Sequence, residues 1–155
     1  ADKHGWSRFV SMQNHYNLVY REEEREMNPL CVEEGIGIIP WSPLARGVTT
    51  GGRTREGAQT ARSQKDDYGT SIYNRDEDFD VGDAVATVAQ AKGVSRAQVA
   101  LAWLLSKPSL TAPIIGTTKL SHLEDAVGAV DITLTADEIA MLEAPYRPHP
   151  ILGHA

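Results

Sequence analysis

The sequence predicts an α/β fold made of three successive strand–helix units, followed by a C-terminal helix and an extended tail. Short apolar segments at residues 8–13, 36–41 and 111–116 have the length of strands. Each is followed, directly or after a loop, by residues with the composition or spacing of a helix. The segment 36–41 is almost wholly apolar, which is typical of a parallel strand buried on both faces. The order of elements therefore indicates parallel strands joined by helices.

The first unit combines the strand at 8–13, a polar loop at 14–17 and a charged helical segment at 21–34. Gly35 supplies the stop signal of that helix. Pro29 lacks an N–H and obstructs a continuous helix, so we expect a kink or a division into two shorter helices.

The second unit contains a long segment, residues 42–78, that is rich in Gly, Thr, Arg and Asp and has little periodicity. A loop of that length in a compact domain is usually functional or mobile, so we expect a lid or a substrate loop. Helical spacing returns at residues 79–92 and ends at Gly93. A second helix is expected to begin under Ser95 as its N-cap.

The third unit pairs the strand at 111–116 with a polar turn and a helix at about 121–130. A last helix is expected to start at Thr135, which is followed by acidic residues suited to a first turn. Residues 145–155 contain three prolines and are expected to form an extended tail.

Two folds use this alternation, the open doubly wound sheet and the (β/α)8 barrel. The nearest approach to a Gly-x-Gly-x-x-Gly phosphate motif lies at residues 35–40, inside the second strand, and ends in Pro40. It cannot turn onto a helix N-terminus, so the dinucleotide-binding open sheet loses its main support.

Composition limits the classes of function. With 155 residues, 41% of them hydrophobic, the chain can form one domain with a core. Its 15 Lys and Arg are scattered among 21 acidic residues, and the net charge of -6 argues against a nucleic-acid surface. No apolar run approaches the roughly 20 residues needed to cross a bilayer. The single cysteine, Cys31, fits a packing role in a reducing cytosol, so we expect a cytoplasmic protein.

Three ordered segments of the sequence resemble the aldo-keto reductases, and together they span essentially the whole chain. They are Ser-Met-Gln-Asn-His-Tyr-Asn-Leu at 11–18, Pro-Trp-Ser-Pro-Leu-Ala-Arg-Gly at 40–47, and Ile-Ile-Gly-Thr-Thr-Lys at 114–119 with the helix that follows. The resemblance implies barrel strands six to eight, and hence a partial (β/α)8 barrel over residues 1–155. It also implies an NADP(H)-dependent oxidoreductase that reduces aldehydes or ketones to alcohols by hydride transfer.

In that resemblance Gln13 would hydrogen-bond the nicotinamide carboxamide, and Trp41 would stack on the nicotinamide ring. From the residues alone, a strand-end Gln that caps loop backbone and a core Trp remain alternatives. The pyrophosphate would lie along Ser42, Leu44 and Arg46.

The phosphate on the adenosine ribose would be held by the turn Gly116, Thr117, Thr118 and Lys119, which favours NADP over NAD. His122 would lie beside that phosphate, although a solvated helix residue is an equal alternative. Asp125 would contact the adenine amine, whereas Ala126 stands where many relatives have Asn, so one adenine contact is expected to be missing.

The four catalytic residues of the family, an Asp, a Tyr, a Lys and a His, come from strands two to four, and nothing in this chain aligns with them. We therefore predict no catalytic residue here. We also predict no metal site, because His4, His149 and His154 lack metal-ligand spacing and look like surface residues.

Three hypotheses follow. A full barrel needs about 250 residues, so the chain is expected to be part, or a natural truncation, of a carbonyl reductase whose completed barrel binds NADP(H) and a small carbonyl substrate. Alternatively, it is a catalytically inactive truncated barrel that acts as an association module through open strand edges. A third option is an enzyme with rebuilt chemistry that uses His15, Tyr16 or Lys119.

Overall fold

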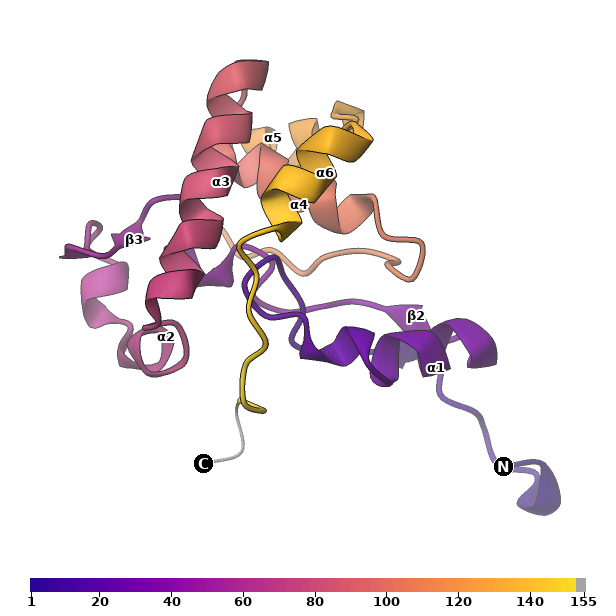
Figure 1. Ribbon diagram of the computed structural model, residues 1–155. Helices are drawn as coiled ribbons and strands as arrows, with labels where there is room; N and C mark the ends of the chain where they lie inside the picture. Colours follow the sequence, from indigo (N-terminus) through magenta and orange to yellow (C-terminus); the bar gives the residue numbers. More distant parts are fainter. Residues whose placement is uncertain (153–155) are drawn as a thin grey trace.

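The computed structural model describes residues 1–152 and places several helices around a small parallel sheet (Figure 1). β1 (Ser11–Met12) pairs in parallel with β2 (Gly37–Ile38), with Ser11 opposite Gly37 and Met12 opposite Ile38. The sequence from 110 to 114 runs along the other side of β2. There the Thr111 N–H donates to the Ile38 carbonyl at 2.9 Å, and the Ile114 N–H donates to the Pro40 carbonyl at 2.9 Å. The α/β prediction is therefore confirmed.

The predicted strands are longer than the observed ones. Phe9 and Val10 are 86% and 82% exposed, because among residues 1–152 the strand β1 has β2 as its only ladder partner. The predicted strand at 111–116 is extended but too irregularly paired to form a named strand. The expectation that 36–41 is buried on both faces is wrong, since Ile36 and Ile39 are only half-buried. Each difference follows from an open side of this small sheet.

The first helical segment divides into two, as expected, but the division lies at residues 25–26 rather than at Pro29. The short turn η2 (Glu22–Glu24) is followed by α1 (Met27–Glu34), and Gly35 closes α1 with a φ of 66°. Pro29 is the third residue of α1. At that position the helix has no acceptor for a backbone N–H, so proline is tolerated.

The expectation of a long loop at 42–78 is wrong, because side-chain hydrogen bonds build structure there that periodicity does not reveal. Asp66, for example, caps the following helix by accepting the Gly69 N–H at 3.0 Å. The elements in this segment are η3 (Ala45–Gly47), the hairpin β3 (Arg53–Thr54) and β4 (Gly57–Ala58), η4 (Ser63–Lys65), α2 (Asp67–Ile72) and the first turn of α3.

The core lies mainly among the longer helices, with α3 (Asp76–Lys92) packed against α4 (Arg96–Leu105) and α6 (Ala136–Glu143) (Figure 1). Both predicted N-caps are present: Ser95 Oγ accepts the Gln98 N–H at 3.1 Å, and Thr135 Oγ1 accepts the Glu138 N–H at 3.2 Å. The largest buried side chains include those of Tyr16, Leu18, Tyr20, Tyr73, Leu101, Trp103, Leu104 and Leu142.

A different environment surrounds α5 (Leu120–Val127), which continues into η5 (Gly128–Asp131). No residue of α5 is buried, and Leu120 and Val127 are 70% and 59% exposed. This apolar face and the outer edge of β1 are therefore uncovered in the structure. None of the described helices is long and apolar enough to cross a membrane.

The tail after α6 folds back onto the body of the molecule. The Tyr146 hydroxyl donates to Glu22, and the His149 N–H donates to Glu22 Oε1 at 2.8 Å. His149 Nε2 lies 2.6 Å from Asp78 Oδ1, and the residue is only 7% exposed. Its prediction as a surface residue is thus wrong, because the tail buries it at the start of α3. His4 is exposed, and His154 lies outside the described residues.

Replacing His149 by Ala should lower the free energy of unfolding by about 2 kcal/mol, because the buried Asp78 carboxylate keeps the Arg75 N–H but loses its imidazole partner. Urea unfolding followed by circular dichroism measures the change. His4→Ala is the matched control and should alter stability by no more than about 0.5 kcal/mol. Equal stability of His149→Ala and the parent would contradict the docked tail.

Candidate cofactor-binding site

A cavity of about 1030 Å³ opens where four segments meet: the loop after β2, residues 60–63, the start of α4, and the turn that leads into α5. Its walls contain nine of the eleven residues predicted to bind a cofactor. They are Ser42, Leu44, Arg46, Gly116, Thr117, Thr118, Lys119, His122 and Asp125. Ala126 lines the same cavity. The parallel register explains this grouping, because the carboxyl ends of parallel strands meet at one edge.

Gln13 and Trp41 are not among the residues that line this cavity. Gln13 is exposed at the end of β1. Trp41 is half-buried, and its ring stacks on His15 at a centroid distance of 4.1 Å and an angle of 16°. His15 stacks in turn on Tyr20 at 4.2 Å and 8°. The plane of Trp41 is thus set by a column of three rings that starts in the core.

His15 is held as a neutral ring in this column. It is 6% exposed, and burial lowers its pKa to about 3, with the charges of His149 and Arg46 acting in the same direction. Its Nε2 lies 2.5 Å from the Tyr73 hydroxyl, which also accepts the Asn17 side-chain N–H at 2.9 Å. This geometry suits a structural role for the His15 ring. It does not support the hypothesis of rebuilt chemistry at His15.

Tyr16 likewise has a structural role, because its hydroxyl is engaged in a hydrogen bond outside the cavity. Burial raises the pKa of its hydroxyl, which donates to Glu24 Oε1 at 2.6 Å. A buried phenol with a raised pKa that already donates to a carboxylate is a poor proton donor at neutral pH. Of the three residues in that hypothesis, only Lys119 is exposed to the cavity.

The loop after β2 has a strained backbone. Ser42, Ala45 and Arg46 adopt positive φ angles of 50°, 46° and 48°, which cost L-residues roughly 1 kcal/mol or more each. Hydrogen bonds offset this cost: the Asn17 amide donates to the Ser42 carbonyl at 2.9 Å, and Thr49 Oγ1 donates to the Leu44 carbonyl at 2.9 Å. Strain of this kind gathers at ligand sites, and it gives the loop a fixed shape before anything binds.

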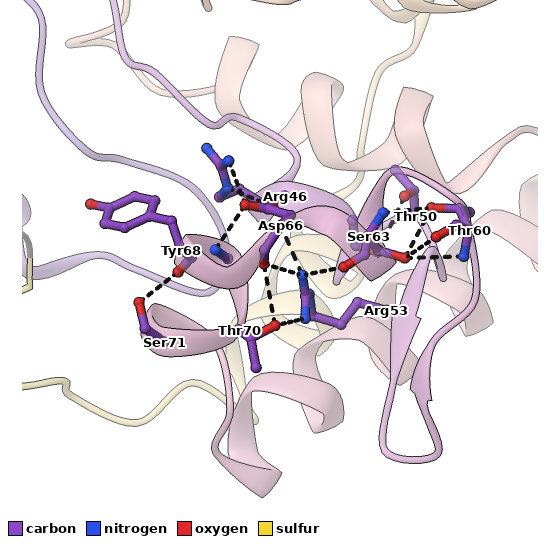
Figure 2. Close-up of polar contacts among 11 residues, drawn as sticks. Arg46, Thr50, Arg53, Thr60, Ser63, Asp66, Tyr68, Thr70 and Ser71 are labelled. Atoms are coloured by element: carbon purple, nitrogen blue, oxygen red, sulfur yellow. Dashed lines mark hydrogen bonds and ion pairs between the residues drawn. The ribbon is translucent and has the colours of Figure 1, made fainter.

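Arg46 anchors the loop through a two-pronged ion pair (Figure 2). Its Nε donates to Asp66 Oδ2 at 2.7 Å and its Nη2 donates to Asp66 Oδ1 at 2.6 Å. The guanidinium also lies 5.3 Å from the centre of the Tyr68 ring. The hydrogen bond from Arg46 lowers the pKa of Asp66, so the carboxylate is ionised at neutral pH.

Arg53 supports this arrangement from the hairpin. It is buried, and its guanidinium donates to Thr70 Oγ1 at 2.6 Å and to the carbonyls of Ser63 and Asp66 at 3.3 and 3.2 Å (Figure 2). Sequence reasoning missed Arg53, since an isolated arginine in an aperiodic segment gives no signal of burial.

The cavity also contains cations that the sequence reasoning did not select. Arg62 and Arg96 line it together with Lys119, and none of the three has a hydrogen bond or ion pair from its side chain within the described part of the chain. The one acidic lining residue, Asp125, accepts a hydrogen bond from Ser95 Oγ at 2.8 Å. A basic cavity in a chain of net charge -6 fits a ligand that carries several negative charges.

The turn before α5 adds donors suited to phosphate. Thr117 Oγ1 donates to the Lys119 carbonyl at 2.9 Å and accepts the Lys119 N–H at 3.2 Å, which shapes the turn. Lys119 immediately precedes α5, so an ammonium group and a helix N-terminus lie together. Among residues 1–152 no cluster of His, Cys, Asp and Glu could hold a metal ion. The donor set fits the phosphates of a dinucleotide.

Comparisons with known proteins identify a family that the chain resembles along almost its whole length. A family model described as the aldo/keto reductase family matches residues 1–147. Versiconal hemiacetal acetate reductase of Aspergillus parasiticus is 44% identical over 155 residues, which cover 97% of this chain and 44% of the relative. A protein provisionally named an aryl-alcohol dehydrogenase in Schizosaccharomyces pombe is 45% identical over 158 residues, covering 99% of this chain and 43% of that protein.

A crystal structure of a thermostable aldo-keto reductase in complex with the inhibitor epalrestat has a similar fold. The TM-score is 0.63 and the sequence identity 23%, and the match covers 90% of this chain and 40% of that one. The chain thus spans less than half the length of these relatives and of this solved structure.

Asp66→Asn should lower the free energy of unfolding by about 2 kcal/mol at neutral pH, because Arg46 and Arg53 lose their shared carboxylate. The folded-state pKa of Asp66 lies below its usual 3.8, so the pair stabilises the fold above that pH and its contribution is lost as the pH falls further. Urea unfolding at pH 7 and pH 3 measures this dependence. A difference between parent and variant that grows toward pH 3 would contradict it.

Proposed function

The chain belongs to the aldo/keto reductase family, and we propose that it forms the NADP(H)-binding part of a reductase that converts aldehydes or ketones to alcohols. The observation that carries this proposal is the basic cavity, whose walls hold nine of the residues selected for cofactor binding. When bound, the nicotinamide cofactor supplies the hydride for carbonyl reduction. The residues of this chain bind and orient it.

Each end of the cofactor would have its own group of residues. Ser42 and Leu44 lie on the strained loop, whose backbone is already shaped for close approach by a pyrophosphate. Gln13 and Trp41 follow the ends of β1 and β2 and would orient the nicotinamide. Because His15 stacks on Trp41, the indole would be positioned before the cofactor binds.

The preference for NADP over NAD would come from the other end of the cavity. Gly116, Thr117, Thr118 and Lys119 form a turn that presents the Thr118 hydroxyl, one ammonium and a following helix N-terminus. His122 lies one turn into α5, on the same cavity wall. This set suits the extra phosphate on the adenosine ribose. Asp125 would accept a hydrogen bond from the adenine amine, in addition to the one that it already accepts from the Ser95 hydroxyl.

We further propose that residues 1–155 are the C-terminal part of a (β/α)8 barrel that acts in the cytoplasm. The relatives are more than twice as long as their matched regions. The catalytic Asp, Tyr, Lys and His, and the walls of the carbonyl site, would come from the other strands of that barrel.

A second candidate function is association without catalysis. It is favoured by the apolar side chains left uncovered on the N-terminal segment that leads into β1, where Trp6, Phe9 and Val10 are 70 to 86% exposed. The face of α5 is uncovered as well, with Leu120 and Val127 prominent. Contiguous exposed apolar residues beside an open strand edge mark a surface for another chain or a second copy.

NADPH titrated into the chain should quench its tryptophan fluorescence, because the nicotinamide would stack on Trp41. The binding is expected to be weak, since the other barrel strands do not support the site. Trp41→Phe should remove most of the quenching, whereas Trp6→Phe should leave it unchanged. Absence of quenching up to millimolar NADPH would contradict the proposed function.

Light scattering tests the association candidate. We predict a molar mass that rises with protein concentration, and a shift toward the monomer when Phe9 and Val10 are both replaced by Ser. The matched control is Met141→Ser, which removes an exposed apolar side chain of α6 away from the strand edge. A strict monomer at all concentrations would count against association.

A further inference from the structure

We propose that Arg96, at the start of α4, supplies the positive charge that binds the pyrophosphate of the cofactor, in place of Arg46. This inference rests on the proposed function and concerns a residue that the family resemblance did not select. The inference follows from the pairing of the arginines that line the cavity. Arg46 is ion-paired, whereas Arg62 and Arg96 have no partner among residues 1–152.

Arg46 is already neutralised. Two hydrogen bonds of 2.6 and 2.7 Å join its guanidinium to Asp66, and the Tyr68 ring lies beside it (Figure 2). If Arg46 turned toward a phosphate, the Asp66 side chain, 9% exposed, would keep the Gly69 N–H but only one cation, the more distant Arg53 at 3.8 Å. Removing one partner from a largely buried ion pair is costly, so Arg46 is better suited to fix the loop than to bind the ligand.

Arg96 lies against the same loop from the opposite side of the cavity. It is the first residue of α4, and its side chain packs directly on Gly51. A Cβ placed on Gly51 would stand 2.7 Å from Arg96 Nη1 and 3.3 Å from Cζ. Gly51 also has a φ of 77°, a left-handed conformation that favours glycine, and its lack of a side chain leaves room for the guanidinium. The contact places the Arg96 guanidinium beside Gly51, in the segment that follows β2.

Nothing in the described structure neutralises Arg96. Its side chain makes no hydrogen bond or ion pair with residues 1–152, and the one acidic residue on the cavity wall, Asp125, is engaged by Ser95. The N–H groups of Arg96 and Ala97 lie in the first turn of a ten-residue helix, where they have no acceptor within the helix. A planar guanidinium next to free amides at a helix N-terminus matches the oxygens of a pyrophosphate.

The roles proposed for Arg96 and Lys119 can be tested separately. Both NADPH and NADH contain the pyrophosphate, whereas only NADPH has the extra phosphate on the adenosine ribose. If Arg96 binds the pyrophosphate, its loss must weaken both nucleotides by the same factor. Loss of Lys119, at the start of α5, must weaken NADPH selectively.

The experiment titrates NADPH and NADH into the full chain and into its Arg96→Gln, Lys119→Gln and Lys3→Gln variants, with dissociation constants from tryptophan fluorescence and from calorimetry. Gln keeps the helix propensity of α4, and circular dichroism verifies folding. We expect Arg96→Gln to weaken both nucleotides about tenfold, as for one lost charge-assisted pair. Lys119→Gln should weaken NADPH about tenfold and NADH less than twofold, and Lys3→Gln, an exposed charge outside the cavity, should change neither.

Two results would overturn the inference. Unchanged binding by Arg96→Gln would remove Arg96 from the site, and a loss confined to NADPH would assign it to the ribose phosphate instead. If the parent chain binds neither nucleotide, the proposed function fails, and inorganic pyrophosphate then tests Arg96 by itself. Binding of pyrophosphate that Arg96→Gln weakens about tenfold would support the inference, and absence of any such binding would overturn it.

Discussion

The parallel register of β2 between β1 and the segment at 110–114 determines where every candidate cofactor residue lies. Pairing of Ser11 with Gly37, and of the Ile114 N–H with the Pro40 carbonyl, aligns three carboxyl ends at one edge. A slip of one residue would reverse which side chains face the core. Because this register holds, Trp41, the strained loop and the turn at Lys119 follow the ends of neighbouring segments, and one cavity opens between the loop and the turn.

Of the charged side chains that surround that cavity, some stabilise the fold and others are available to bind a ligand. Arg46 and Arg53 are occupied by Asp66 and its neighbours, and they hold the hairpin and α2 against the loop (Figure 2). Arg62, Arg96 and Lys119 have no such partners among residues 1–152. The paired arginines keep the backbone of the loop in its strained conformation, and the unpaired cations make the cavity attractive to phosphates. The two roles depend on each other, because a flexible loop would not present a fixed binding surface.

Local signals in the sequence predicted the caps and helices well. The side chains of Ser95 and Thr135 cap the starts of α4 and α6, and Gly35 ends α1 with a left-handed conformation. The same reasoning failed where long-range contacts decide the structure. Residues 42–78 are ordered by ion-paired arginines and a capping carboxylate rather than by apolar periodicity, and His149 is buried because the tail docks on Glu22 and Asp78. The cavity-lining residues followed from ordered motifs, whereas Arg96 became visible only through its contact with Gly51.

A map of backbone amide chemical shifts during titration with NADP tests the cofactor site most directly. We expect the largest changes at residues 42–47, 95–97 and 116–126, which border one cavity. Small changes are expected in α1 and at Lys107, which line a separate surface groove of about 460 Å³. Changes concentrated at that groove, or spread evenly over the chain, would contradict the assignment of the basic cavity as the cofactor site.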